Sequence, residues 1–212
     1  MSFDRVARSY RLLETLAFGQ ALQRARIQWL DNIPRPKRVL ILGEGNGRFL
    51  CELLRVHPKI DIDCVDASTR MLSLAETRLR RSHPESCQHV RFIHADILQW
   101  SPPNSYDLIV THFFLDCFPR NELKAIVDKL AHAAAPGAVW LLADFDIPPV
   151  GIFAQMQATF LLRLMYLFFR YVAGITANAL VDPSPHLEAT NFILMSRRTF
   201  RVAMIKSELW QQ

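Results

Sequence analysis

The 212-residue sequence has few cysteines, few glycines and no unbroken apolar run long enough to cross a membrane. Its four cysteines form no CxxC pair and have no ligand-like spacing with histidine, so we expect reduced thiols and no bound metal. The longest apolar stretch, residues 152–172, is interrupted by two glutamines and two arginines. The opening residues lack the apolar segment of a secretory signal. These absences predict a cytoplasmic protein.

What the sequence does contain is typical of one folded domain. Hydrophobic residues make up 50% of the chain, which is enough for a large core. The formal net charge is +5, and the excess of arginine near the start is spread out instead of clustered. A spread of this kind favours a solvated surface over a nucleic-acid patch.

Apolar and amphipathic segments alternate along most of the chain. A helix is predicted over residues 5–30, and Pro34 and Pro36 end it. Unbroken apolar runs, typical of buried parallel strands, alternate with helical patterns, and a proline–glycine pair closes the last of these helices. The predicted strands are 39–42, 60–65, 90–94, 107–111 and 138–143, and the helices between them are 48–57, 68–80 and 120–135.

This alternation predicts an α/β fold with a doubly wound, Rossmann-like sheet. The last residues indicate two further strands around Arg197 and Arg198, forming an antiparallel hairpin. The whole is expected to be a mostly parallel seven-stranded sheet with helices on both faces.

Three of only seven glycines stand within five residues, in the stretch VLILGEGNG that ends the first predicted strand. Glycine permits tight dihedrals and close backbone approach, and the carboxyl edge of such a sheet holds ligands. Asp66 ends the next strand, where a carboxylate can accept bonds from ribose hydroxyls, and Asp96 follows the third. A dinucleotide and S-adenosylmethionine both fit this outline. The spacing GxGxG, with Arg48 where a dinucleotide site has its third glycine, disfavours the dinucleotide.

Over residues 36–146 the chain resembles the class I S-adenosylmethionine-dependent methyltransferases. The family's motifs match VLILGEGNG, CVDAS followed by ML, FIHADI, YDLIVTHFFLD and the PG turn of APGAVWLLADF. The opening FDRVARSY resembles the ubiquinone and menaquinone type, in which an N-terminal helix closes over the cofactor. The resemblance implies S-adenosyl-L-methionine as cofactor. It implies cofactor contacts from Gly43, Glu44, Gly45, Gly47, Asp66, Ala67, Met71, Asp96, Ile97 and Thr111.

The first motif departs from the family at one position. The family has an acid two residues before the first glycine, where this chain has Ile41. Glu44 is expected to supply the missing negative charge near the cofactor's ammonium group. The alternative is that Glu44 is simply a loop carboxylate.

Methyl transfer from a sulfonium requires little catalytic machinery beyond alignment and exclusion of water. His112 follows the fourth strand, where it acts either as a general base or as a packing residue. Asp116 either orients His112 or caps the next helix. The residues expected to contact the substrate are Tyr10, Phe113, Asp116, Phe153 and Phe160.

The segment 152–172 has more apolar surface than one packing face needs. It is expected to wall an acceptor pocket, to lean on a membrane surface or to form a dimer interface. The chain is accordingly divided into an N-terminal helical cap (1–35), a cofactor-binding core (36–146), a helical insertion or lid (147–185) and a C-terminal hairpin (186–212).

The function predicted is transfer of a methyl group from S-adenosylmethionine to a small, lipophilic acceptor. The expected partners are a hydrophobic small molecule, a weak peripheral contact with the inner membrane surface and, as an open alternative, a second copy of the chain. A different class of function is a non-catalytic cofactor-binding or membrane-surface protein with the same fold, which Ile41 favours. A nucleic-acid methyltransferase is unsupported, because THFF stands where an NPPY-like motif is expected.

Overall fold

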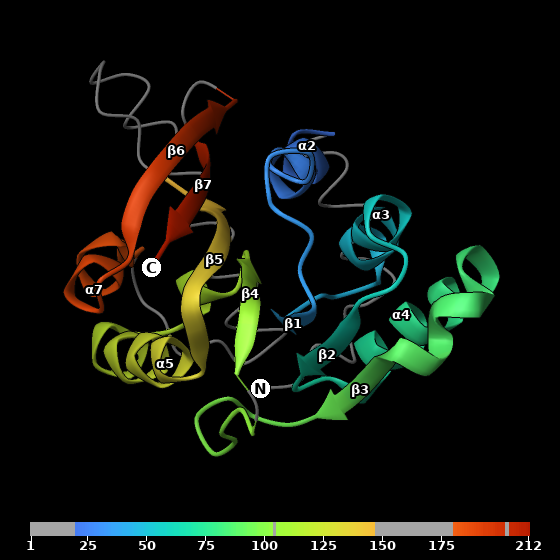
Figure 1. Cartoon of the computed structure of the whole chain (residues 1–212). Helices are drawn as coiled ribbons and strands as arrows, with labels where there is room; N and C mark the ends of the chain where they lie inside the picture. The colour runs from blue at the N-terminus through green and yellow to red at the C-terminus, as the bar shows by residue number, and fades with distance from the viewer. Residues whose placement is uncertain (1–19, 104, 147–179, 202–203) are drawn as a thin grey trace.

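The computed structural model describes residues 20–103, 105–146, 180–201 and 204–212. One mixed sheet carries helices on both faces (Figure 1). The strands are β1 (Arg38–Leu42), β2 (Asp61–Asp66), β3 (Val90–His94), β4 (Tyr106–His112), β5 (Ala134–Phe145), β6 (Ile193–Phe200) and β7 (Ile205–Gln211). The helices are α2 (Ala21–Ile27), α3 (Arg48–Val56), α4 (Thr69–Ser82), α5 (Arg120–His132) and α7 (Ser184–Ala189), with two 3-10 turns, η1 (Pro84–His89) and η2 (Leu115–Cys117).

The strand order is β3-β2-β1-β4-β5-β7-β6. Strands β1 to β5 pair in parallel, and β7 joins β5 and β6 in antiparallel fashion. The predicted seven-stranded, mostly parallel sheet with an antiparallel C-terminal hairpin is therefore confirmed. The chain reverses its direction of winding at β1 and β4, so the carboxyl ends of these strands border the crevice typical of open α/β sheets.

Each face of the sheet has its own core, because alternate residues of the central strands point in opposite directions. Val39 and Ile41 pack with residues of α3 and α4. Leu30 and Ile33, which follow α2 in the chain, belong to the same core. Leu40 and Leu42 pack with α5 and α7. The α2 helix covers the ends of β5 and β7 on the first face, where Ser207 Oγ donates to the carbonyl of Ala25 at 2.7 Å.

A buried carboxylate links three strands of the sheet. Asp63 in β2 is 2% exposed, and Arg91 of β3 donates to it through both Nε and Nη2 at 2.6 Å. The hydroxyl of Tyr106, at the start of β4, donates to Asp63 Oδ2 at 2.7 Å. Because β1 lies between β2 and β4, the Tyr106–Asp63 bond crosses over the central strand.

The structure corrects two predicted boundaries. The helix expected over residues 120–135 ends at His132, and β5 begins at Ala134, so Pro136 and Gly137 lie inside the strand. The ladder with β4 shifts its register between Tyr106 and Leu108, which accommodates the extra residues as a bulge. Proline disfavours helix in the residue before it, so the helix has to end earlier than the pair itself.

The hairpin turn also lies elsewhere than predicted. Arg197 and Arg198 are inside β6, and the connection to β7 falls after Phe200, where Arg201 has a φ of 52°. Of the helix predicted over residues 5–30, the described part is α2, and residues 28–32 form turns. The helix predicted at 152–172 lies outside the described residues. Within the described part of the chain, no helix is long and apolar enough to cross a membrane.

Candidate cofactor site

A cavity lies at the carboxyl edge of the sheet, where α2, the β1–α3 turn and the ends of β2, β3 and β4 meet. It is lined by Arg26, Leu42, Gly43, Glu44, Gly45, Asn46, Arg48, Phe49, Val65, Asp66, Ala67, Met71, Ala95, Asp96, Ile97, His112, Phe113, Phe114, Cys117 and Phe118. Most of the cofactor residues predicted from the sequence are therefore brought together at one place. Polar groups lie on the glycine turn and the two strand-end aspartates, and aromatic rings cover the side next to β4 and η2.

The three glycines of the β1–α3 turn all have left-handed backbone angles, with φ of 66°, 71° and 80°. A Cβ on Gly43 would lie 2.6 Å from Cδ2 of Phe114, and one on Gly47 would lie 2.8 Å from the Cα of Ala75. A Cβ on Gly45 would meet no atom of the described part of the chain within 4 Å. Packing within the protein therefore explains two of the glycines, whereas Gly45 leaves open space inside the cavity. That space is where a ligand can approach the backbone.

Glu44 has a role that the sequence did not reveal. Its Oε1 accepts hydrogen bonds from the backbone N–H groups of Phe49 and Leu50, both at 3.0 Å. These are among the unpaired donors at the start of α3, whose N-cap residue, Gly47, has no side chain with which to bind them. Burial raises the pKa of Glu44 to about 7, against the lowering effect of these bonds and of Arg26.

The second strand ends in a turn that is held by its own side chains. Asp66 Oδ1 accepts from the N–H of Ser68 at 2.8 Å, and Ser68 Oγ accepts from the N–H of Met71 at 3.2 Å. Ser68 is thus the N-cap of α4, which begins close to the predicted start of the helix at residue 68. Asp66, Ala67 and Met71 all line the cavity.

The third strand delivers Asp96 and Ile97 to the cavity. Asp96 Oδ1 accepts from the N–H of Leu98 at 3.0 Å, so one carboxylate oxygen holds the local turn. Lys129 of α5 donates to the carbonyls of Ile97 and Trp100 at 2.6 and 2.8 Å. These bonds fix the segment against the sheet.

His112 ends β4 on the face that α2 and α3 cover. It is 7% exposed, and its ring meets the ring of Phe49 edge-on at a centroid distance of 4.5 Å. Its Nδ1 has no hydrogen-bond partner among the described residues. Burial, and secondarily the charge of Arg26, hold the pKa of His112 well below its usual value. The ring is therefore neutral at neutral pH.

Phe113 has a left-handed backbone, with a φ of 54°, which is uncommon for a bulky residue. The Arg26 guanidinium lies 5.0 Å from its ring centroid, and the ring of Phe145 lies 5.2 Å away. This stack places a cation and an aromatic ring together at the His112 end of the cavity.

Two predicted site residues lie away from the cavity. Thr111 is fully buried on the opposite face from His112, where its Oγ1 accepts from the Trp140 indole at 2.8 Å. Asp116 lies in η2; burial, and secondarily the charge of Asp116, raise the pKa of the buried carboxyl of Asp144. It does not cap α5, because the residue at that position is Pro119, which makes no side-chain cap bond. Tyr10, Phe153 and Phe160 lie outside the described residues.

Several lining residues were not predicted. The turn after β4 contributes Phe114, Cys117 and Phe118 as well as Phe113, and α2 and α3 contribute Arg26 and Arg48. The signal for the first group was their position directly after a strand that ends at the ligand edge. Nothing in the sequence distinguishes Arg26 from its neighbouring arginines. Among the described residues, no group of three or more histidine, cysteine or acidic side chains is placed to hold a metal.

Comparison with known proteins indicates which class of protein has a site of this kind. A family model described as a methyltransferase domain matches residues 40–140. A demethylmenaquinone methyltransferase of Thermus thermophilus is 29% identical over 175 residues, which is 81% of this chain and 77% of that protein. The demethylmenaquinone methyltransferase of Thermotoga maritima is 39% identical over 80 residues, which is 37% of this chain but only 35% of that protein.

Solved structures share the fold. The N-methyltransferase NodS of Bradyrhizobium japonicum, in complex with S-adenosylhomocysteine, superposes with a TM-score of 0.60 at 16% identity, covering 99% of this chain and 89% of that one. An O-methyltransferase family protein of Burkholderia thailandensis gives a TM-score of 0.68 at 15% identity, covering 98% of this chain and 61% of that one. These matches support a class I S-adenosylmethionine-dependent methyltransferase family for this chain, with S-adenosylmethionine as the cofactor.

Proposed function

We propose that this protein transfers the methyl group of S-adenosylmethionine to a small, lipophilic acceptor. The observation that carries the proposal is the division of the cavity into a polar and an aromatic part. Glu44, Asp66 and Asp96 lie along the strand ends, and Phe113, Phe114 and Phe118 cover the remaining side. The relatives include proteins named for demethylmenaquinone, for a malonyl-acyl-carrier protein and for trans-aconitate. Of these names, the first supports a lipophilic acceptor.

The polar residues fit the cofactor. The open space above Gly45 admits its amino-acid part, beside Glu44 and Arg26. Asp66 keeps one oxygen on the Ser68 N–H, and its other oxygen is expected to accept from ribose hydroxyls. Asp96 and Ile97 are expected to hold the adenine. When bound, the sulfonium supplies an activated methyl group and leaves as a neutral thioether.

The protein's own contribution is to align the acceptor and to exclude water. The aromatic residues after β4 supply a dry surface at the His112 end of the cavity. His112 is buried and neutral, so a ring nitrogen is available to accept a proton from an acceptor hydroxyl or amine. The low pKa makes it a weak base, which suits an acceptor whose own pKa falls as the methyl group is transferred.

The test of the proposal is calorimetric titration with S-adenosylhomocysteine. Asp66→Ala should weaken binding by about 1–3 kcal/mol, because buried ribose hydroxyls lose their acceptor. Asp61→Ala is the matched control, since Asp61 stands at the other end of the same strand, paired with His89. Equal affinities in the three proteins would overturn the proposed cofactor site.

Turnover separates the enzyme from a non-catalytic protein of the same fold. Radiolabelled methyl transfer should be tested with a short-chain demethylated quinol and with trans-aconitate. Transfer to the quinol and not to the acid supports a lipophilic acceptor. Tight cofactor binding without transfer to any member of a wider acceptor panel would favour the non-catalytic alternative.

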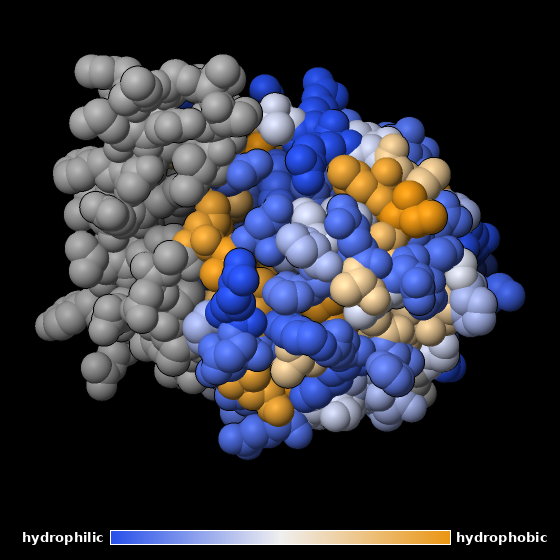
Figure 2. Space-filling view, turned by 90° about the vertical axis from the view of Figure 1, so that its left-hand side faces the viewer, coloured by the Kyte–Doolittle hydropathy of each residue, from blue (hydrophilic) through white to orange (hydrophobic). Residues whose placement is uncertain are grey.

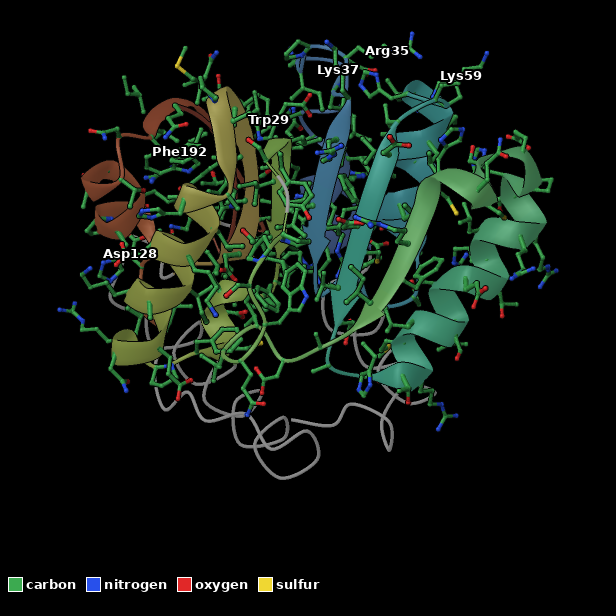
Figure 3. The ribbon with its side chains drawn as sticks, turned by 60° about the horizontal axis from the view of Figure 1, so that its bottom comes forward. Trp29, Arg35, Lys37, Lys59, Asp128 and Phe192 are labelled. Atoms are coloured by element: carbon green, nitrogen blue, oxygen red, sulfur yellow. The ribbon has the colours of Figure 1, made fainter. Side chains whose placement is uncertain are left out.

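The proposed contact with a membrane has to involve the cavity end of the molecule. The exposed residues Arg35, Lys37 and Lys59 gather at the amino ends of β1 and β2, at the edge of the sheet away from the cavity (Figure 3). Docking of these residues on anionic lipid would turn the cavity away from the bilayer. We therefore expect that charge reversal of Lys37 and Lys59 leaves turnover of a vesicle-borne acceptor unchanged.

A further inference from the structure

The charges in the cavity lining are unevenly distributed. Three acidic side chains, Glu44, Asp66 and Asp96, follow the ends of the first three strands. An anionic group that enters the cavity is repelled by the ionised members of this set unless a cation lies beside it. The described residues of the lining include two cationic side chains, Arg26 and Arg48. A ligand that carries a carboxylate therefore needs one of these arginines.

The position of Arg48 is fixed by the glycine turn. Arg48 is the first residue of α3 and directly follows Gly47, whose φ is 80°. Arg78 of α4 donates from Nε to the carbonyl of Asn46 at 2.7 Å, so the turn is held against the neighbouring helix. Side chains of a helix incline toward its amino end. The Arg48 side chain accordingly extends back toward the turn, and it lines the cavity there.

The guanidinium of Arg48 has its donors free. The side chain is half-buried, and it makes no hydrogen bond or ion pair with the described part of the chain. The guanidinium of Arg26, by contrast, already stacks on Phe113, 5.0 Å from the ring centroid. Of the two arginines, Arg48 is therefore the one that we expect to bind an anionic group.

A carboxylate fits both the space and the donors beside Arg48. The open space above Gly45 lies in the same turn. A guanidinium presents parallel N–H groups that match the two oxygens of a carboxylate. Asn46 also lines the cavity, and its side-chain amide can donate a further hydrogen bond. The turn thus combines room for a ligand with donors for a carboxylate.

We propose that Arg48 is a specificity-determining residue, which binds a carboxylate inside the cavity. This inference rests on the function proposed above. Two ligands can supply the group: the amino-acid part of S-adenosylmethionine, and an acceptor that carries an acid. In either case the ligand with the carboxylate is preferred over the same molecule without it. Loss of a hydrogen bond between charged groups corresponds to a change of about 10- to 100-fold in Kd.

The first experiment titrates the full-length protein with two nucleosides. S-adenosylhomocysteine carries the carboxylate, and methylthioadenosine is a similar thioether without the amino-acid part. If the carboxylate is the cofactor's, Arg48→Gln should raise the Kd for S-adenosylhomocysteine by about 10- to 100-fold and leave that for methylthioadenosine unchanged. Arg48→Lys keeps the charge but not the paired N–H groups, so it should lose less affinity than Arg48→Gln.

The matched control is Arg55→Gln. Arg55 lies in the last turn of the same helix, where its Nε is 2.9 Å from Glu52 Oε2 and its side chain is 66% exposed. This variant should bind both nucleosides like the parent protein. The unchanged Kd for methylthioadenosine shows in addition that Arg48→Gln is folded.

The second experiment tests the acceptor as the source of the carboxylate. Methyl transfer is measured with a dihydroxybenzoate and with its methyl ester, in which the acid is uncharged. If the carboxylate is the acceptor's, Arg48→Gln should leave both nucleoside Kd values unchanged. It should lower transfer to the acid, relative to the ester, by about tenfold or more.

Asp66→Ala separates this inference from the proposed cofactor site, because both nucleosides carry the ribose that Asp66 is expected to bind. Unchanged Kd values in Arg48→Gln, without a selective loss of transfer to the acid, would overturn the role of Arg48. The cofactor site would still stand if Asp66→Ala weakened the binding of both nucleosides. Failure of the parent protein to bind S-adenosylhomocysteine would overturn both proposals.

Discussion

At the scale of single residues, Glu44 caps a helix from within the cavity lining. Gly47 cannot cap α3, and Ile41 cannot supply the family's acid. Glu44 caps the helix through Oε1 and lines the cavity at the same time. The sequence indicated a role for the charge of Glu44 but not its capping bonds. These bonds come from backbone N–H groups five and six residues further along the chain, in a helix whose start was predicted only approximately.

The charge of Glu44 should report on cofactor binding. With a pKa of about 7, the group is mostly protonated at pH 6.5, and a nearby ammonium group would favour its ionised form. Binding of S-adenosylhomocysteine should then release up to about one proton, which calorimetry in buffers of different ionisation enthalpy would measure. Glu44→Gln keeps the capping oxygen and should abolish the release, whereas Glu85→Gln, on the exposed η1 turn, should not. Equal proton release in all three proteins would leave Glu44 as a cap alone.

Substitution of Gly45 and of Gly47 should have different effects, the first on cofactor affinity and the second on stability. Alanine at Gly45 or Gly47 must adopt a left-handed backbone, at a cost of about 1–2 kcal/mol in either position. Gly47→Ala also drives a Cβ against the backbone of Ala75, so we expect the larger loss of unfolding free energy in urea. Gly45→Ala should keep most of its stability but lose cofactor affinity. Matching losses of both quantities in the two variants would contradict this division.

At the scale of elements, the buried strands were predictable because a parallel strand covered on both faces is apolar without alternation. The β1 run from Val39 to Leu42 is buried throughout. The errors occurred where turn residues and element boundaries do not coincide. The chain reverses after Phe200 in a stretch without glycine, proline, asparagine or aspartate, and a proline–glycine pair lies within β5.

The residues of the site could be predicted where their position directly after a strand places them at the carboxyl edge of the sheet. Asp66 and Asp96 follow strands, so their place at the carboxyl edge came from topology alone. Thr111 was predicted to contact the cofactor, but its side chain bonds to Trp140 on the face opposite to His112. Successive side chains of a strand point to opposite faces, so neighbouring positions lead to different places. Arg26 comes from a helix remote in sequence, and its approach to Phe113 depends on tertiary packing that no local pattern encodes.

Strand β6 lies at one edge of the sheet and carries exposed apolar side chains. Ile193 and Met195 are 66% and 55% exposed. Figure 2, which looks at the side of the molecule carrying β6 and α7, shows apolar surface broken by polar residues. Arg197 and Arg198 lie further along the same strand, and charges on an edge discourage pairing with another sheet.

At the scale of the whole molecule, three buried carboxyls should make stability depend on pH. Glu44, Asp116 and Asp144 all have raised pKa values, so the folded protein binds protons that the unfolded chain releases. Their stabilising contribution is present at low pH and is lost as the pH rises through about 6 to 7 and beyond, with a slope of at most about 1.4 kcal/mol per pH unit for each proton.

Two histidines act in the opposite direction at lower pH. His57 and His112 have lowered pKa values, so stability increases as the pH rises through their unfolded value near 6.5. Urea denaturation should accordingly show stability that declines from about pH 6.5 to pH 8.5, and Asp144→Asn and Glu44→Gln should each reduce this decline. Stability that increases steadily from pH 6 to pH 8.5 would contradict the raised carboxyl pKa values.

The bonds around Asp63 have a consequence for the order of folding. The Tyr106–Asp63 bond joins residues 43 positions apart and crosses β1, which must already be in place. We therefore expect it to form after the transition state, so removing it should accelerate unfolding and leave the refolding rate nearly unchanged. Stopped-flow measurements on Tyr106→Phe would show this as a shift in the unfolding limb of the chevron alone. The link would then act as a kinetic barrier to opening of the sheet.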